Sequence, residues 1–539
     1  MTAPGDVRKR PAGVPPAGAS PPGALGIDGA VPVYLVITAF TVVAVYLRFF
    51  QLLRPGFLLG MSEYDDGVMF GNAVRLVNGV IPYRDFAVVQ PPGSIVLMTP
   101  VALLTKVSGT TDGGLGIARI LTAAADCACV PLLGLLVRHR GALAAGVTCG
   151  IYAVYPDALV ASHTFLLEPW LNLFCLIGAL CVFNGDWVAD GRRLAWAGLA
   201  FGFAVTIKIW ALVPLAVIGF VVLHQRGPRR LLLLAGGATA GVGLAFLPFL
   251  ILAPGATVRD AIISQLIRSG GGTGSLLPRL TDMAALSLFP GLPKAAVVLI
   301  LLVIAAAVPL GYLLVCLSAG RLPAALDWYV LVGGAAVILM LIWPYGYYTH
   351  YGDFAGPFIA LALGLLVGLM RQVGRGDLIR TLAVGTVAAA LIGGIGLRQL
   401  EVEVHLQPWA NPAVTADRLI PRGACVVTNV TALTVVANRF VPDTAGCPSV
   451  VDSYGTLIAM TDGRELKADP QVLGTVGAFW RSAFAHATYV WLVAPTQGEI
   501  PWTRSLHDYF VRHYRLIGLA SIHPGGPRIP RGGLYVRRQ

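Results

Sequence analysis

The segment SEYDDGVMFGNAVRLVNGVIPYRDFAVVQPPGS, residues 62–94, holds the side chains best suited to chemistry. It carries four carboxylates, Glu63, Asp65, Asp66 and Asp85, and it follows the first long apolar stretch of the chain. A carboxylate at a membrane surface can accept a proton from an attacking group. Acids at the start of a helix are also favoured by the helix dipole, so Asp65 and Asp66 have a plain capping explanation. Two adjacent acids exceed what capping needs, which favours chemistry.

The elements that position these acids must be membrane helices. The mean hydropathy of the chain is +0.74, and 56% of its 539 residues are hydrophobic while 12% are charged. Apolar runs of about 18 residues or more recur, which is the length that a helix needs to cross a bilayer. These runs do not alternate as β-barrel strands do. The sequence therefore predicts a polytopic α-helical membrane protein. Arginines in loops explain the net charge of +12, and nucleic-acid binding is not expected.

The distribution of basic residues predicts the topology. Arginine clusters fall on alternate loops, so the positive-inside rule places residues 1–30 in the cytoplasm, as a disordered Pro/Gly-rich tail. This topology requires that residues 92–109, which begin with a proline pair, form an interfacial or re-entrant helix and not a full span. The protein is expected in the plasma membrane, and its transmembrane domain spans residues 31–400. About eleven spans are predicted, near residues 31–52, 115–137, 141–158, 165–184, 194–206, 209–225, 230–252, 293–318, 327–344, 355–370 and 380–398.

This topology gathers the polar and aromatic loops on the outer face of the membrane. A face that combines acids, a lysine and aromatic side chains from separate loops is the natural place for chemistry. The loops are residues 54–93, 156–170, 206–210, 254–292 and 343–357.

After residue 400 the composition changes. Segments rich in Val, Tyr and Ile alternate with segments of helical period, which predicts a small α/β domain over residues 401–539 with a largely parallel sheet. The predicted topology places this domain outside the cytoplasm. It lacks a Gly-rich phosphate-binding motif, which argues against nucleotide binding. Cys425 and Cys447 lie in this region, and they can pair if it faces an oxidising compartment.

The acidic segment resembles the first outer loop of GT-C membrane glycosyltransferases, especially the branch of protein O-mannosyltransferases and aminoarabinose transferases. In that family an acidic pair follows the first span, and an Ala, a Gly, a Pro-Tyr and a Pro-Pro come after it. The matching residues here are Asp65, Ala73, Gly79, Pro82 with Tyr83, and Pro91 with Pro92. Asp66 stands where the family usually has Glu, which shortens the reach of the second acid.

The resemblance continues through most of residues 31–370. SHTFLLEPWLNLF is similar to the second acidic motif, with Glu168 in the carboxylate place. GLAFGFAVTIKIW is similar to a short span that delivers a lysine, here Lys208, to the outer surface. YGYYTHYGDFAGP is similar to the late tyrosine-rich loop. Each motif taken alone has low specificity. The resemblance rests on the order of the motifs along the chain and on the side of the membrane predicted for each.

The resemblance implies a GT-C fold and the transfer of a sugar from a polyprenyl-phosphate donor on the outer face. Asp65 is then the general base for an acceptor hydroxyl, with Asp66 beside it, and the reaction inverts the anomeric carbon. Lys208 and Arg268 are the candidate cations for the departing phosphate. Lys208 also fits a lysine that snorkels from a helix end.

Four further side chains are candidates for binding the acceptor or a metal. Glu168 and His163 can orient the base, bind the acceptor or hold a divalent cation, and capping explains Glu168 equally well. His350 and Tyr348 can shape the lipid or sugar pocket, although an aromatic belt predicts the same composition. No ligand spacing specifies an ion, so metal use stays open.

Two charged residues fall inside the second predicted span. Arg119 and Asp126 share one helix face, and an ion pair inside the bundle explains them without a functional role.

A second class of function is a transporter or flippase for a lipid-linked or amphipathic solute, and a third is a scaffold. Transporters often show internal repeats and ionisable groups near the middle of the membrane. This chain shows no repeat and places most acids in outer loops. The sequence names neither the sugar nor the acceptor, which can be an envelope glycan, a lipid or a protein hydroxyl.

Overall fold

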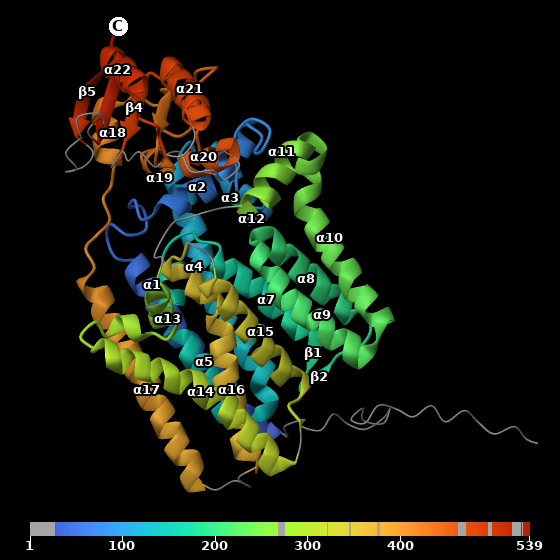
Figure 1. The fold of residues 1–539 in the computed structure, drawn as a ribbon. Coiled ribbons are helices and arrows are strands. Elements are labelled where there is room, and N and C mark those ends of the chain that lie inside the picture. Colours follow the sequence, from blue (N-terminus) through green and yellow to red (C-terminus); the bar gives the residue numbers. More distant parts are fainter. Residues whose placement is uncertain are drawn as a thin grey trace, which may run out of the picture.

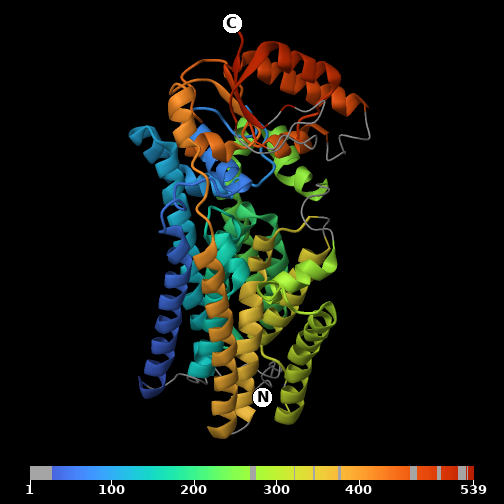
Figure 2. The ribbon, with the colours of Figure 1, turned by 90° about the vertical axis from the view of Figure 1, so that its left-hand side faces the viewer.

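A bundle of long helices carries a smaller domain at one of its ends (Figures 1 and 2). The structure is a computed structural model, and it describes residues 27–267, 275–320, 322–343, 346–373, 378–461, 470–493, 499–519, 530 and 532–539. Helix α1 (Ile27–Leu52) runs toward the end of the bundle that the smaller domain covers, so the acidic segment emerges directly beneath that domain (Figure 2).

Each span predicted from hydropathy lies on a helix of the bundle. Among the described residues, eight helices are long and apolar enough to cross a membrane, or nine if α5 and α6 (Pro156–Ser162), bent by 54°, form one span. Helices α7 and α8 have 15 residues each, so the predicted count of about eleven spans stays a prediction. The chain is a multi-pass membrane protein. The remaining bundle helices are α4 (Thr111–Val137), α5 (Ala142–Ala153), α7 (Glu168–Val182), α8 (Arg193–Ile207), α9 (Leu212–Arg226), α10 (Pro228–Leu252), α14 (Lys294–Ala319), α15 (Ala325–Ile342), α16 (Gly356–Val373) and α17 (Leu378–His405).

Glycines bring α8 and α10 into backbone contact. A Cβ on Gly198 or Gly202 of α8 would lie 2.0 or 2.1 Å from a carbonyl oxygen of α10, and Gly237 of α10 is equally close to α8. Small residues allow such close approach of membrane helices, whose association depends on packing. At the far end, the short hairpin of β1 (Phe183–Asn184) and β2 (Trp187–Val188) joins α7 to α8.

Short helices connect the bundle at the end that carries the smaller domain. A Cβ on Gly93, the first residue of α3, would lie 2.4 Å from the Thr206 hydroxyl oxygen near the end of α8. This contact brings the proline-rich start of α3 next to the turn that carries Lys208. The connecting elements are α2 (Tyr64–Val77), α3 (Gly93–Ser108), α11 (Pro254–Val258), α12 (Ser264–Ile267), α13 (Leu276–Met283) and the 3-10 helix η5 (Thr349–Phe354).

The C-terminal region contains both strands and helices, as the sequence predicts, and the bounds of a domain over residues 401–539 stay a prediction. Its sheet has the order β3-β4-β6-β5, formed by β3 (Val426–Thr428), β4 (Tyr489–Leu492), β6 (Gly533–Arg537) and β5 (Tyr514–Leu519). Its helices are α18 (Ala413–Leu419), α19 (Thr431–Val436), α20 (Ser453–Thr461), α21 (Pro470–His486) and α22 (Arg504–His513).

The prediction of a largely parallel sheet is wrong. Only β3 and β4 pair in parallel, while β6 is antiparallel to both β4 and β5. Alternation of strands and helices indicates an α/β domain, but it does not fix which strands become neighbours, and here β6 enters between β4 and β5. A disulfide joins Cys425 to Cys447, with their Cα atoms 5.5 Å apart.

Candidate functional site

The acid pair lies in the first turn of α2. Asp66 is buried, whereas Asp65 is half-buried. Glu63, at the N-cap position, makes no side-chain capping bond, and Asp65 has no hydrogen bond or ion pair with any residue in the described part of the chain. Capping therefore does not account for Asp65. Its carboxylate is available to a ligand.

Asp66 has a different environment from Asp65, because its charge is already paired. It forms an ion pair with Arg119 of α4, and the Thr164 hydroxyl donates a hydrogen bond of 2.6 Å to the same carboxylate oxygen. Arg119 also donates to the carbonyl oxygens of Leu58 and Gly60, at 2.7 and 2.8 Å. A buried pair with these additional hydrogen bonds anchors the acidic segment to the bundle. Asp66 thus acts as an anchor beside Asp65.

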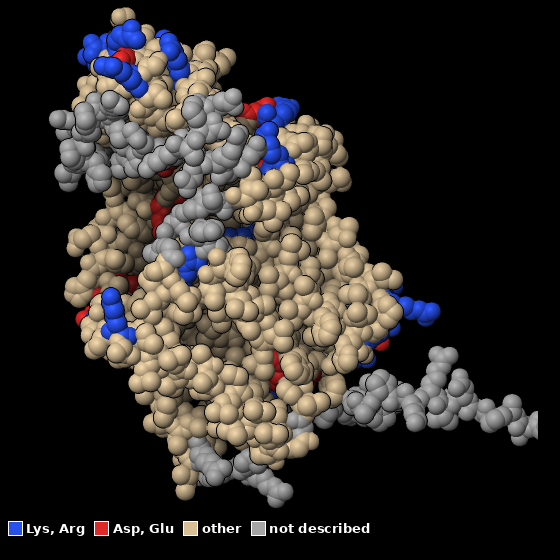
Figure 3. Space-filling view, in the orientation of Figure 1, with Lys and Arg blue, Asp and Glu red and all other residues tan. Residues whose placement is uncertain are grey.

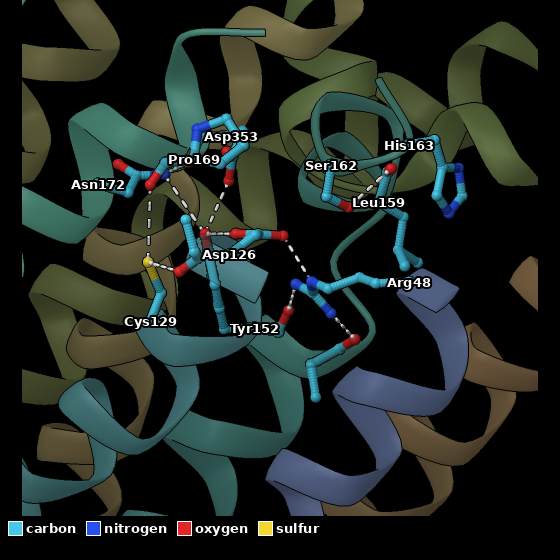
Figure 4. A network of polar contacts seen from close by, with 12 residues as sticks. Arg48, Asp126, Cys129, Tyr152, Leu159, Ser162, His163, Pro169, Asn172 and Asp353 are labelled. Carbon is cyan, nitrogen blue, oxygen red and sulfur yellow. Dashed lines mark hydrogen bonds and ion pairs between the residues drawn. The ribbon is translucent and has the colours of Figure 1, made fainter. Parts of the chain in front are cut away.

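Arg119 and Asp126 are both in buried ion pairs, but not with each other. Asp126 pairs with Arg48 of α1 at 2.5 Å, and the Tyr152 hydroxyl contacts Asp126 at 2.5 Å and Asp353 of η5 at 3.0 Å. Figure 4 shows Asp126 between Tyr152 and Arg48. This network ties α1, α4 and α5 to η5, so it holds the segment that carries His350.

Lys208 lies in the turn after α8, and its side chain is buried. Its ammonium nitrogen is 2.5 Å from a carboxylate oxygen of Glu168, the first residue of α7. The same nitrogen lies over the rings of Trp210 and Tyr351, at 3.5 and 3.9 Å from their centroids. A snorkelling lysine would reach toward water, so this explanation does not fit. Lys208 is a buried cation between a carboxylate and two aromatic faces.

His350 joins the same group of side chains. It is buried and stacks on Tyr348, with 5.7 Å between the ring centroids. The charges of Glu168, Lys208 and Asp65 all act on His350. We use the term acid–lysine site for Asp65, Glu168, Lys208 and His350.

Two predicted site residues are not in this group. His163 ends α6, and its Nε2 lies 3.8 Å from a carboxylate oxygen of Glu403 on α17. Figure 4 shows it beside Arg48. The chain turns between the end of α6 and the start of α7, so the ionic contact of His163 is with Glu403, and its role beside Glu168 stays a prediction. Arg268 lies outside the described residues.

The acids of this region interact strongly with one another. Glu63 is exposed, yet its pKa is raised to about 7, first because neighbouring protein atoms displace water from its carboxyl and then because Asp65, Asp66 and Glu168 are negative. The shift places Glu168 of α7 within electrostatic range of the α2 acids. Charges on α2, α7 and the turn after α8 thus all act on His350 of η5.

The raised pKa of Glu63 predicts a pH-dependent stability. The folded protein holds a proton on Glu63 that the unfolded chain releases near its ordinary pKa of 4.5, so this group supports folding at low pH and loses that contribution as the pH rises through about 7. Glu63→Gln should raise the thermal unfolding midpoint in detergent near pH 8 and leave it unchanged below pH 4.5. Solvent screening limits the gain to about 1 kcal/mol.

The matched control for this experiment is Glu401→Gln. Glu401 is an exposed acid on α17 that is paired with Arg398 at 2.6 Å. This variant should not gain stability at high pH. A pH-independent effect of Glu63→Gln would contradict the mutual repulsion of the acids.

Sequence reasoning missed some buried acids near the site. Asp157, at the start of α6, is buried, and neither of its carboxylate oxygens has a hydrogen-bond partner among the described residues. A Cβ on Gly352 would lie 1.7 Å from one of these oxygens. Asp157 follows a proline at a helix start, where an acid looks like a cap, and Asp353 follows a glycine in a loop. Both carboxylates are buried in the structure. The local sequence does not indicate this burial, so neither acid stood out.

A metal centre is not evident at the site. In the part of the chain that the structure describes, no group of three or more His, Cys, Asp or Glu side chains is arranged to hold a metal ion. Glu168, the expected ligand, is paired with Lys208 instead. The residues present do not fit a preformed cation site.

Comparisons with known proteins identify the fold. No protein-family model and no curated protein matches the chain. Among solved structures, ArnT from Cupriavidus metallidurans bound to undecaprenyl phosphate is similar, with a TM-score of 0.53 and 14% identity over 93% of this chain and 97% of that one. The Archaeoglobus fulgidus oligosaccharyltransferase in its apo form has a TM-score of 0.50 and 13% identity, over 85% of this chain and 69% of its own.

These two structures belong to the GT-C superfamily of membrane glycosyltransferases. The chain therefore has the GT-C fold, which confirms at the level of the fold the resemblance inferred from the acidic segment.

Proposed function

We propose that the protein is a GT-C glycosyltransferase that moves a sugar from a polyprenyl-phosphate donor to a hydroxyl acceptor. The observation that carries this proposal is the acid–lysine site itself. It combines a half-buried carboxylate without a partner among the described residues, Asp65, with a buried cation, Lys208, at the end of a bundle with the GT-C fold. The solved ArnT structure, bound to undecaprenyl phosphate, supports a polyprenyl-phosphate donor.

The proposed reaction needs a base and a cation, and the site supplies both. The acceptor hydroxyl oxygen attacks the anomeric carbon while Asp65 takes its proton. The bond from that carbon to the phosphate oxygen breaks, and the polyprenyl phosphate leaves with the electron pair. Lys208 stabilises the charge that develops on this phosphate. A single displacement inverts the anomeric carbon, and the products are the glycoside and polyprenyl phosphate.

The same proposal places the site on the outer face of the plasma membrane, with the N-terminus in the cytoplasm. The Cys425–Cys447 disulfide supports an oxidising environment for the C-terminal domain. Arginines such as Arg138, Arg193 and Arg226 lie at helix ends on the far side of the bundle, as the positive-inside rule requires of a cytoplasmic face. Between the two ends, the face of the bundle in Figure 3 carries few charged side chains.

A transfer assay tests the proposal. Purified protein in liposomes is incubated with radiolabelled polyprenyl-phosphate sugars, both hexoses and pentoses, and with envelope glycan, lipid and hydroxyl-peptide acceptors. We expect label to pass to one acceptor class, with inverted anomeric configuration by NMR. Movement of labelled lipid across the bilayer without transfer to any acceptor would contradict the proposal and favour a flippase.

A further inference from the structure

Helix α2 is packed against the C-terminal domain along one face. A Cβ on Gly67 would lie 2.2 Å from the backbone nitrogen of Ala432 at the start of α19. Farther along α2, the guanidinium of Arg75 lies 4.3 Å from the centroid of the Phe440 ring. The glycine is needed for this close approach, since any side chain there would push α19 away. The helix that begins with the acid pair is thus part of the domain interface.

Tyr64, the first residue of α2, makes the polar contact of this interface. Its hydroxyl donates a hydrogen bond of 2.8 Å to Asp452 and accepts one of 3.1 Å from the backbone N–H of Tyr454. The Ser453 hydroxyl lies 3.0 Å away. Burial, together with the charges of Asp452 and Glu499, holds the pKa of Tyr64 well above its usual range. The phenol therefore keeps its proton and serves as a donor to Asp452.

Asp452 is itself held firmly at the start of α20. The backbone N–H of Gly455 donates to its carboxylate at 2.6 Å, and the N–H of Thr456 donates to its carbonyl oxygen at 2.8 Å. The neighbouring Ser453 hydroxyl bonds the carbonyl oxygen of Asn429, directly after β3, at 2.9 Å. Tyr64 is therefore tied to the framework of the domain and not to a loose loop.

These contacts fix the chain on both sides of Asp65. Tyr64 is held by the C-terminal domain through Asp452, and Asp66 is held by the bundle through Arg119 and Thr164. Asp65 lies between them, and its side chain has no partner among the described residues. In the described part of the chain no hydrogen bond or ion pair fixes the direction of this side chain, so its placement depends on the backbone, which two different parts of the molecule hold.

We propose that Tyr64 and Asp452 are positioning residues, through which the C-terminal domain fixes the carboxylate of Asp65 against the donor sugar. This inference rests on the proposed function. The domain then has a part in catalysis without touching the substrate, because a general base is effective only at hydrogen-bond reach of its proton. Small errors of placement lower the rate of reaction steeply while binding is preserved.

The test compares Tyr64→Phe with a matched variant, Tyr514→Phe. The Tyr514 hydroxyl also bonds inside the C-terminal domain, to the carbonyl oxygens of Phe484 and Ala487 at 2.5 and 2.7 Å, and neither of these residues belongs to α2. We expect Tyr64→Phe to lower kcat about tenfold with an unchanged KM for the donor. Tyr514→Phe should keep the wild-type kcat. Asp452→Ala should match Tyr64→Phe, and the double variant should fall no further.

Hydrogen–deuterium exchange of residues 64–77 gives a readout that is independent of activity. Exchange should rise in Tyr64→Phe and Asp452→Ala and stay at the wild-type level in Tyr514→Phe. An unchanged kcat in Tyr64→Phe, an equal loss in Tyr514→Phe, or additive losses in the double variant would overturn the inference. Absence of sugar transfer by the wild-type protein would instead overturn the proposed function. The exchange data would then still show whether the contact between Tyr64 and Asp452 stabilises α2.

Discussion

Asp65→Asn is expected to lower kcat for sugar transfer by about a thousandfold, with a change of no more than a few-fold in the KM of the donor. Asparagine has the shape of aspartate but cannot take the proton of the attacking hydroxyl. Positioned general bases contribute about 10²- to 10⁴-fold to rate. Because Asp65 has no hydrogen bond or ion pair among the described residues, its replacement breaks none in that part of the chain. The initial rate of transfer in liposomes measures this effect.

Asp85→Asn is the matched control for this variant. Asp85 lies in the same acidic segment, but it accepts a hydrogen bond of 2.7 Å from the backbone of Ile81 and pairs with Arg84 at 2.8 Å. The control should keep kcat within about twofold, since exposed pairs of this kind contribute little. Wild-type activity in Asp65→Asn would show that Asp65 is not the general base. A loss confined to a well-folded Asp66→Asn would move the base to Asp66.

The helices and strands were predictable because they follow from local patterns. Hydropathy marks the helices of the bundle, and segments rich in Val, Tyr and Ile mark the four strands of the C-terminal sheet, near Val426, Val490, Leu516 and Tyr535. The order of that sheet was not predictable. This order depends on the position of β6 between β4 and β5. That position results from tertiary packing, and the sequence of a single segment does not indicate it.

The candidate site was predictable as separate motifs, but its pairings were not. Asp65, Glu168, Lys208 and His350 each stood out as a polar residue near the end of an apolar segment. That Glu168 would pair with Lys208 depends on how α7 and α8 meet. His163 was expected to act with Glu168 because the two are close in sequence, and its contact with Glu403 of α17 could not be predicted from that closeness.

Anchoring residues were harder still to predict. Arg48 is an ordinary basic residue near the end of an apolar helix, and nothing in its local sequence indicates that it pairs with Asp126. Asp452 lies far from Tyr64 in sequence, in a domain of different composition. Such contacts require the folded arrangement, because each joins two segments whose local patterns are independent.

Lys208→Met is expected to lower kcat for transfer by about a hundredfold or more, because a cation aimed at the departing phosphate is lost. The ion pair with Glu168 offers a competing explanation. Removal of the lysine leaves a buried carboxylate without its partner, which costs about 3–5 kcal/mol of stability for buried pairs in general. A loss of activity in this variant alone therefore does not separate phosphate binding from a purely structural role.

The double variant Lys208→Met with Glu168→Gln separates the two roles. It removes both charges of the pair, so no carboxylate is buried alone, and the thermal unfolding midpoint should return toward that of the wild type. If Lys208 served only to neutralise Glu168, transfer would return with stability. We expect a stable protein that stays inactive, and a Glu168→Gln single variant that keeps kcat within about tenfold, because the cation remains in place to meet the phosphate.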